Sequence, residues 1–463
     1  MNTKGPYRHL PAFIRKMEAE GLPAMVIDTF AGYYREVAAG ERGFICDAEL
    51  TPVSADEVRM TGDPGAYAPA GRDALHKTVM IVLNGGLGTS MGLQGPKSLL
   101  EVKPGISFLQ VIVEQAAARG AELALMNSFN THEATRRALE KIRPPQDPVL
   151  FVQHKFPKIL QKDLSPAVWP PNPALEWNPP GHGDIYTALV TSGTLQQLLD
   201  EGKRTAFICN SDNLGAVLDP VLLGYFVQRR LHFMMEVAER TPADLKGGHL
   251  ARCMDGRLVL REAAQCPSGE LDAFRDIGRY RYFNTNSLWI DLPFLQALVA
   301  REKTIRLPII VNPKTLDPRD RNSPPVYQIE TAMGAAVALF EDAAGVLVNR
   351  SRFLPVKKCN QLLALRSDCY VYDRENGFRI NPSRSLDSLH IDLDPRYFEK
   401  IDEFDARFPE GAPSLLACES LTVRGDVRFE ADVVIRGRVT IVNEGSRQAV
   451  VRRGSVVAGD LVL

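Results

Sequence analysis

The chain has 463 residues, and its 55 Lys and Arg nearly balance its 56 Asp and Glu, for a formal net charge of −1. This balance disfavours a protein that binds nucleic acid or a membrane surface through net positive charge. The length suits about three domains of roughly 150 residues each. The sequence has no apolar run near the roughly 20 residues that span a bilayer, no secretory signal pattern at its start, and no CxxC pair among its seven cysteines. Composition therefore predicts a soluble, cytoplasmic globular protein.

Residues 1–75 carry apolar side chains at helical spacing, first around Phe13 and Met17 and then from Phe30 to Val37. This periodicity predicts a mostly helical N-terminal region, 1–75, which ends in a loop rich in Gly, Pro and Ala.

From residue 76 to 370, strand-length apolar runs alternate with longer stretches of helical spacing. Continuous runs of Val, Ile, Leu and Met suit strands that are buried on both faces. The alternation predicts a doubly wound α/β domain, whose ligands bind at the carboxyl ends of its strands. The strand-like runs are Val79–Leu83, Leu123–Met126, Thr205–Cys209 and Phe233–Val237, and the helical stretches are Ile106–Arg119, Thr131–Lys141 and Ile185–Leu199.

The C-terminal residues, 415–463, repeat with a six-residue period after a connecting segment, 371–414. Such a period, with small residues at fixed places, is typical of a parallel β-helix of either hand. An ordinary β-meander with coincidental spacing is the alternative. The recurring positions are Leu421, Val427, Val433 and Val439, then Val423, Phe429, Ile435 and Ile441, with Gly425, Ala431 and Gly437 between them.

A glycine-rich loop follows the first strand-like run and extends from Asn84 to Lys97. Its glycines allow the backbone to approach a ligand closely, so that successive N–H groups can surround phosphate oxygens, and Lys97 adds a positive charge. Two familiar phosphate-binding loops do not match. Pro96 stands where a Walker loop requires Gly, and Met91 stands where a dinucleotide-binding loop requires Gly. The segment therefore indicates a phosphate-binding loop of another kind.

The segment Asn84-Gly85-Gly86-Leu87-Gly88-Thr89, followed by Pro96-Lys97, resembles the GGxGT…PK signature of sugar nucleotidyltransferases. This version resembles that of the eukaryotic-type UTP–glucose-1-phosphate uridylyltransferase family. The resemblance covers residues 78–370, and the six-residue repeat resembles the family's C-terminal β-helix. It implies a mixed, Rossmann-like nucleotidyltransferase sheet and a β-helix of left-handed type. Six further motifs follow in the family's order: Pro180–Tyr186, Asn210–Ala216, Lys246–Leu250, Phe283–Asn286, Tyr327–Ala332 and Phe353–Lys357.

The resemblance implies a role for each candidate site residue. Lys97 and Lys357 are the implied catalytic residues, and the Pro-Val-Lys spacing favours Lys357 over the adjacent Lys358. Asp212 is the implied Mg²⁺ ligand. A carboxylate after a strand-like run suits that role, although an Asp-Asn turn is the ordinary interpretation of these residues alone. The implied nucleotide-binding residues are Leu83, Asn84, Gly85, Gly86, Gly88, Thr89, Gln153, Gly181, Asn210 and Asp212, and the implied sugar- and phosphate-binding residues are His182, Gly248, Glu262, Asn284 and Asn286.

The activity that the resemblance implies converts UTP and α-D-glucose 1-phosphate to UDP-glucose and pyrophosphate, reversibly. An oxygen of the sugar phosphate attacks the α-phosphorus of UTP in line, with Mg²⁺ as the cofactor. A broad-specificity UDP-sugar or UDP-N-acetylhexosamine pyrophosphorylase stays open, because Ser287 stands where the family usually has Asn. A non-catalytic nucleotide-sugar-binding protein stays open too. The expected partners are these substrates and products, with no nucleic acid and no membrane, in a monomer or a small homo-oligomer.

Overall fold

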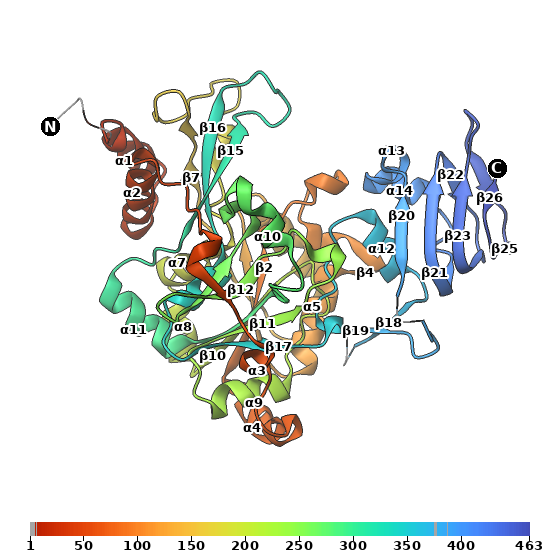
Figure 1. Ribbon diagram of the computed structural model, residues 1–463, viewed down its shortest axis with the longest axis horizontal. Helices are drawn as coiled ribbons and strands as arrows, with labels where there is room; N and C mark the ends of the chain where they lie inside the picture. The colour runs from red at the N-terminus through yellow and green to blue at the C-terminus, as the bar shows by residue number, and fades with distance from the viewer. Residues whose placement is uncertain (1–4, 6, 375–376, 387) are drawn as a thin grey trace.

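The structure is a computed structural model that describes residues 5, 7–374, 377–386 and 388–463. It has a large α/β body, with helices α1 and α2 at one end of the long axis and strands β20 to β26 at the other (Figure 1). Helices α1 and α2 and the strands of the C-terminal stretch therefore lie at opposite ends of the molecule.

A ten-stranded mixed sheet forms the centre of the body. Its middle is parallel, with β10 (Thr205–Asn210), β2 (Thr78–Asn84), β5 (Glu122–Asn127) and β6 (Val149–Val152) side by side in that order. On the other side of β10, β14 (Tyr282–Asp291) is antiparallel. The remaining strands are β12 (His249–Cys253), β13 (Leu258–Arg261), β1 (Leu50–Pro52), β11 (Phe233–Glu239) and β17 (Ala343–Leu347).

Both faces of this sheet are covered. Side chains alternate along a strand, and successive residues of β2 enter different apolar clusters: Val79 and Ile81 pack in one, Met80 and Val82 in the other. The predicted α/β domain with a mixed sheet is thereby confirmed. Its helices are α5 (Phe108–Ala118), α6 (His132–Ile142), α7 (Ile185–Thr191), α8 (Thr194–Asp200), α9 (Pro220–Gln228), α10 (Leu271–Arg275), α11 (Leu292–Glu302) and α12 (Cys359–Arg366).

The four strand-like runs of the sequence are the strands β2, β5, β10 and β11. The prediction of one helix over Ile185–Leu199 is wrong, because the structure has two helices there, α7 and α8. Gly193 lies between them with a φ of 77°. This left-handed conformation ends an α-helix, and glycine adopts it without strain.

The N-terminal region begins with α1 (Leu10–Ala19) and α2 (Ala24–Ala38), as its periodicity predicts. The rings of Phe13 and Phe30 lie 5.2 Å apart between these helices, and the pair packs against a three-stranded sheet of β15, β16 and β8. The region is not helical throughout, because β1 joins the central sheet beside β12. Its other helices, and the strands of this second sheet, are α3 (Ala55–Val58), α4 (Ala68–Ala74), β8 (Ile159–Leu160), β15 (Ile309–Thr315) and β16 (Pro325–Thr331).

The C-terminal strands pair in parallel at steps set by the six-residue repeat. Leu421 of β21 pairs with Val439 of β23, three repeats further along the chain. The eight recurring apolar side chains that the sequence singles out are all buried. The elements from residue 370 onward are β18 (Tyr370–Asp373), β19 (Gly377–Ile380), β20 (His390–Leu393), α13 (Pro395–Phe398), α14 (Ile401–Arg407), β21 (Ser414–Arg424), β22 (Val427–Phe429), β23 (Val434–Val442), β24 (Ala449–Val451), β25 (Val456–Val457) and β26 (Leu461–Val462).

Four short strands connect these larger parts: β3 (Glu101–Lys103), β4 (Ile106–Ser107), β7 (Phe156–Pro157) and β9 (Trp177–Asn178). Within the described part of the chain, every helix is too short or too polar to cross a membrane.

The contact between α4 and α9 predicts a stability effect. A Cβ atom built on Gly224 would lie 1.9 Å from the carbonyl oxygen of Tyr67, which precedes α4. We therefore expect Gly224→Ala to force the two helices apart and to lower the free energy of unfolding by about 1–3 kcal/mol. Urea unfolding measures the change. Gly269→Ala is the matched control, because a Cβ atom there meets nothing within 4 Å. Equal midpoints for the two variants would contradict the packing argument.

Candidate active site

The glycine-rich loop follows β2 and closes on itself. The backbone N–H of Lys97 donates to the carbonyl oxygen of Gly86 at 3.1 Å, and Leu87 pairs with Pro96 in an antiparallel bridge. A Cβ atom on Gly88 would lie 2.3 Å from Leu93, so the turn has no room for a side chain there. The closed loop therefore fixes the position of the Lys97 backbone. Gly86 and Thr89 stay exposed on it.

A buried polar network fixes the first turn of this loop. The amide of Asn84 donates to Asn127 Oδ1 at 2.8 Å and to Thr135 Oγ1 at 2.9 Å. The hydroxyl of Ser128 donates to the carbonyl oxygen of Gly85 at 2.9 Å. Because both side-chain N–H groups of Asn84 donate to protein partners, they are not available to donate to a nucleotide. Sequence reasoning missed Asn127 and Ser128, although both follow the strand-like run of β5 at its carboxyl end.

Gln153 lies beside the loop at the end of β6. Its backbone N–H donates to the carbonyl oxygen of Asn127 at 2.8 Å, and a Cβ atom on Gly85 would lie 2.9 Å from Gln153 Nε2. On the other side of β2, the backbone N–H of Ser211 donates to the carbonyl oxygen of Leu83 at 3.2 Å, and Asn210 pairs in register with Leu83. The predicted nucleotide-binding residues of β2, β6 and β10 therefore meet at one edge of the sheet.

Asp212 joins the two predicted catalytic lysines. Its Oδ2 atom accepts a hydrogen bond from Lys97 Nζ at 2.9 Å and from Lys357 Nζ at 3.0 Å. Burial by itself raises the pKa of the Asp212 carboxyl, but the positive charges of Lys357 and Lys97 outweigh it and hold that pKa below its usual value. The Oδ1 atom is buried and has no hydrogen-bond partner among the described residues. It is the oxygen with which this site could hold a cation.

His182 comes directly after Gly181, at the start of a short 3₁₀ helix (His182–Asp184). Gly181 has a φ of 79°, and a Cβ atom on it would lie 2.5 Å from the carbonyl oxygen of Thr331. The backbone N–H of Met333 donates to His182 Nδ1 at 3.0 Å. Burial, and to a lesser extent the charge of Lys357, lowers the pKa of His182 to about 4. The imidazole is therefore neutral near pH 7 and carries its proton on Nε2.

Four predicted sugar-side residues lie together at the ends of β12, β13 and β14. A Cβ atom on Gly248 would lie 2.7 Å from the carboxyl carbon of Glu262, and the backbone N–H of Asn284 donates to the carbonyl oxygen of Gly248 at 2.9 Å. The amide of Asn284 donates to Asn286 Oδ1 at 2.9 Å. Asn286 has a φ of 59°, an uncommon conformation for a residue inside a strand. Burial raises the pKa of Glu262 to about 7.

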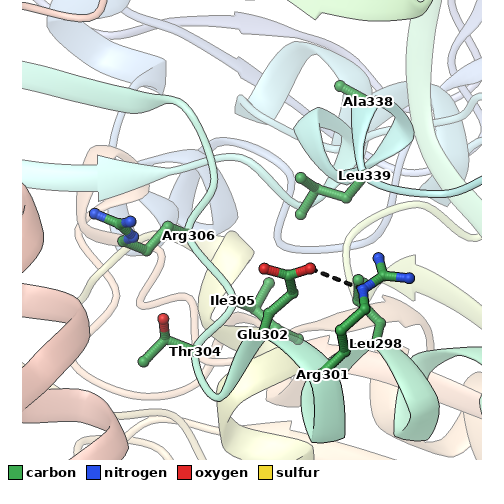
Figure 2. Close-up of a pocket in the computed structure, with 8 residues that line it drawn as sticks. All are labelled: Leu298, Arg301, Glu302, Thr304, Ile305, Arg306, Ala338 and Leu339. Atoms are coloured by element: carbon green, nitrogen blue, oxygen red, sulfur yellow. Dashed lines mark hydrogen bonds and ion pairs between the residues drawn. The ribbon is translucent and has the colours of Figure 1, made fainter.

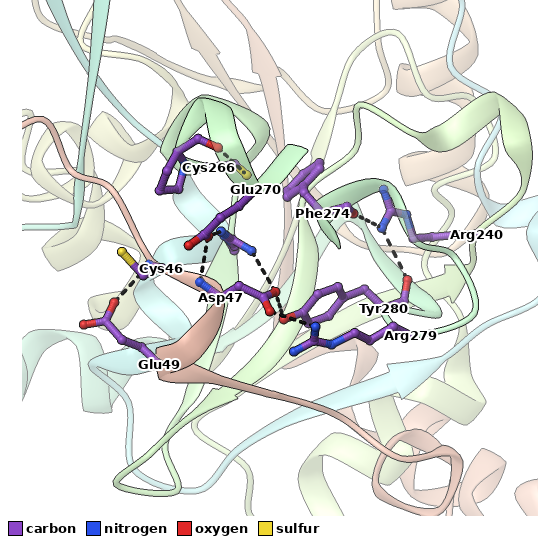
Figure 3. Close-up of polar contacts among 11 residues, drawn as sticks. Cys46, Asp47, Glu49, Arg240, Cys266, Glu270, Phe274, Arg279 and Tyr280 are labelled. Atoms are coloured by element: carbon purple, nitrogen blue, oxygen red, sulfur yellow. Dashed lines mark hydrogen bonds and ion pairs between the residues drawn. The ribbon is translucent and has the colours of Figure 1, made fainter. Parts of the chain in front are cut away.

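Asp47, from the N-terminal segment, is the centre of an ion cluster, part of which Figure 3 shows. Asp47 accepts a hydrogen bond from the Tyr280 hydroxyl at 2.7 Å and pairs with Arg279 at 2.7 Å and with Arg261 at 3.4 Å. Arg261 is the residue before Glu262 and is fully buried. The N-terminal segment thus anchors the hairpin that carries Gly248 and Glu262.

A cavity of about 340 Å³ lies apart from this site, between α11 and the segment that follows it (Figure 2). Its lining includes Leu298, Ile305 and Leu339, with the Arg301–Glu302 ion pair at its rim.

The site has the residues that phosphate chemistry requires. A glycine-rich loop, a buried carboxylate and two lysines, all at the carboxyl edge of a mixed α/β sheet, define a nucleotidyltransferase. The family model described as UTP–glucose-1-phosphate uridylyltransferase matches residues 27–436. The chain belongs to this family.

Relatives from several eukaryotes agree. UTP–glucose-1-phosphate uridylyltransferase from Solanum tuberosum is 40% identical over 393 residues, which cover 83% of this chain and 80% of the relative. The Hordeum vulgare protein of the same name is 40% identical over 418 residues, which cover 87% and 86%. Among solved structures, UDP-glucose pyrophosphorylase from Leishmania major aligns with a TM-score of 0.88 and 40% identity, over 98% of this chain and 99% of that one.

The raised pKa of Glu262 predicts how stability depends on pH. Because the folded state holds the carboxyl proton up to about pH 7, while the unfolded chain releases it near its ordinary pKa of about 4.3, the free energy of unfolding falls as pH rises between these values. We therefore expect Glu262→Gln to gain stability over wild type at pH 8 relative to pH 5, by chemical denaturation. Glu444→Gln, on an exposed loop, is the control. A difference that stays constant with pH would contradict the assignment.

Proposed function

We propose that this protein catalyses the reversible conversion of UTP and α-D-glucose 1-phosphate to UDP-glucose and pyrophosphate. The observation that carries the proposal is the convergence of Lys97 and Lys357 on the Asp212 carboxylate beside the glycine-rich loop. Family membership supports it, since relatives 40% identical over most of the chain are named for this activity. Their names also favour glucose 1-phosphate over an N-acetylhexosamine phosphate, and the presence of every expected phosphate ligand favours an enzyme over a silent binding protein.

Different residues bind different parts of the substrate. Backbone N–H groups of the glycine-rich loop and Lys97 hold the triphosphate, and Lys357 neutralises the charge that develops on the α-phosphate oxygens in the transition state. An oxygen of the sugar phosphate then forms a bond to the α-phosphorus while the bond to pyrophosphate breaks. The phosphate monoester is already an anion, so no residue has to remove a proton. Catalysis is mainly positioning and charge neutralisation.

The neutral imidazole of His182 has a specific part in this arrangement. Its Nδ1 atom accepts from Met333, so Nε2 is a hydrogen-bond donor of fixed orientation. We assign this donor to a phosphate oxygen. Gln153 presents an amide, with donor and acceptor together, to the mixed edge of uracil. Glu262, Asn284 and Asn286 offer similar groups to the hydroxyls of the sugar.

Mg²⁺ is the proposed cofactor, and Asp212 is the residue that would hold it. The fit rests on the buried Oδ1 atom, which has no partner among the described residues. Mg²⁺ commonly binds through one or two carboxylates together with substrate phosphates. When bound, it supplies positive charge that offsets the charge of the phosphate oxygens.

We also propose the finer organisation of the chain. The boundaries 1–75, 76–370, 371–414 and 415–463 remain our division into domains, and the last part is a left-handed-type parallel β-helix. Its support is the parallel pairing of Leu421 with Val439 at a step of three six-residue repeats. The protein is a monomer or a small homo-oligomer in the cytoplasm. The seven free cysteines support a reducing compartment.

One assay tests the function directly. We expect the purified protein to release pyrophosphate from UTP and glucose 1-phosphate with Mg²⁺, and EDTA to abolish the release. A panel with galactose 1-phosphate and N-acetylglucosamine 1-phosphate measures specificity by kcat/KM. The proposal fails if no sugar phosphate gives pyrophosphate, and a preference for another sugar phosphate would establish a different pyrophosphorylase.

The two lysines predict a matched set of variants. We expect Lys97→Ala and Lys357→Ala to fold normally and to lose about 10²–10³ in kcat, because each removes a charge that stabilises the transition state. Steady-state pyrophosphate release measures the loss. Lys358→Ala is the control, because Lys358 is exposed and lies next to Lys357, as the N-cap residue that precedes α12. Wild-type turnover in either of the first two variants would remove that lysine from the mechanism.

A further inference from the structure

We propose that Asn213 is a positioning residue that sets Lys357 in place relative to Asp212. Lys357 is on a segment, residues 351–357, that we call the strap. This inference rests on the proposed function, because it explains how that function's catalytic lysine is held. Asn213 touches no reacting group and acts through the strap.

Asn213 binds the strap with both ends of its side-chain amide. Its Nδ2 atom donates to the carbonyl oxygen of Arg352 at 3.1 Å. Its Oδ1 atom accepts from the backbone N–H of Leu354 at 2.7 Å, and from that of Gly215 at 3.3 Å. Asn213 is buried. A donor and two accepted bonds in one place use the full chemistry of an amide, which neither a carboxylate nor an apolar side chain reproduces.

Backbone contacts also attach the strap to the segment that contains Asp212 and Asn213. Asn213 pairs with Pro355 in an antiparallel bridge. The backbone N–H of Val356 donates to the carbonyl oxygen of Asp212 at 3.0 Å. Lys357, the next residue of the strap, then reaches the Asp212 carboxylate with its Nζ atom. Asn213 is therefore part of a short series of contacts that links Asp212 to Lys357.

The start of the strap is fixed as well. Arg352 forms a buried ion pair with Glu236 of β11, with both of its contacts at 2.7 Å. A Cβ atom on Gly215 would lie 2.5 Å from the carbonyl oxygen of Ser351, so the strap packs directly on the loop after β10. Because its start cannot shift freely, loss of the Asn213 bonds would release mainly the part from Leu354 to Lys357.

The position of Lys357 depends strongly on this attachment of the strap, because its own side chain is held by few neighbours. Its side chain is 59% exposed, against 12% for Lys97, so few neighbours hold it. A shift of about 1 Å in a catalytic group can cost about 10²-fold in rate. The side chain of Asn213 has no contact with the glycine-rich loop among the hydrogen bonds of the described residues. Its loss should therefore impair kcat and leave UTP binding intact.

The first experiment separates kcat from KM. We expect Asn213→Ala to lower kcat by about 10- to 100-fold, with the KM for UTP unchanged within about twofold. Asn349→Ala is the matched control, because exposed Asn349 also accepts a backbone N–H, that of Ser351, but its side chain has no hydrogen bond to the loop after β10 within the described residues. Unchanged kcat in Asn213→Ala, or an equal loss in Asn349→Ala, would overturn the proposal.

The second experiment is a double-mutant cycle with Lys357→Ala. If Asn213 acts through Lys357, Asn213→Ala should change kcat by less than about twofold once Lys357 is absent. Losses that multiply would show that Asn213 has a general structural role, and would overturn the inference. Asn213→Asp repeats the cycle in a form expected to fold, because its carboxylate can still accept from Leu354 and Gly215. We expect it to show the same dependence on Lys357.

A third measurement does not depend on activity. Hydrogen exchange of the strap peptide should accelerate in Asn213→Ala, because the amides of Leu354 and Val356 lose their protection, while the peptide of the glycine-rich loop stays unchanged. Unchanged exchange in the strap would overturn the proposal. If wild type releases no pyrophosphate, the proposed function fails on its own, and this measurement still decides whether Asn213 holds the strap.

Discussion

The shared carboxylate of Asp212 is the interaction on which the rest of the site depends. Its negative charge pairs with the largely buried Lys97 and with the exposed Lys357, so the cluster has a net charge of +1, which attracts anions. Removing ions from water is costly unless they are paired. Asp212 offsets that cost for Lys97, whose side chain is only 12% exposed. Anionic phosphates can then take the place of the carboxylate as partners of the lysines.

The fold brings these three residues together from distant parts of the chain. Lys97 ends a loop that closes on Gly86, Asp212 follows the central strand β10, and Lys357 is on the strap. Parallel strands put the first two at one edge of the sheet. The strap reaches the same edge because the Arg352–Glu236 ion pair ties it to β11, at the centre of the molecule. The sheet and a buried ion pair therefore bring together residues that are far apart in the sequence.

Sequence patterns predict the parts of this protein whose physics is local or periodic. The runs of β2, β5, β10 and β11 are recognisable because strands buried on both faces must be apolar throughout. The C-terminal repeat is recognisable because each six-residue repeat buries the same positions. The break at Gly193 is different, since a left-handed residue disrupts a helix without disturbing its apolar spacing. Strand β1 is too short to show a period and is fixed only by pairing with β12.

Some residues of the site can likewise be located from the sequence, and others cannot. Lys97 ends the glycine-rich loop that follows the strand-like run of β2, and Asp212 comes shortly after the run of β10, so their place at the sheet edge follows from chain order. The attachment of Asn213 to Arg352 and Leu354 does not, because it joins residues 139 and 141 positions apart. Asn and Arg are ordinary in loops, and only the folded backbone shows what they bind. The resemblance to a family finds the lysine, but it does not show what holds the lysine in place.

Burial and pairing create two kinds of polar environment among the candidate site residues. On the phosphate side, charges persist because they are paired, as in the Asp212 cluster, whose carboxyl has a lowered pKa. On the sugar side, burial without a counter-charge raises the pKa of Glu262 to about 7. At His182, burial together with the charge of Lys357 keeps the imidazole neutral. In the proposed complex, a chain with almost no net charge receives a highly anionic substrate and a neutral, hydroxyl-rich sugar, because its positive charge is concentrated at the residues that we assign to the phosphates.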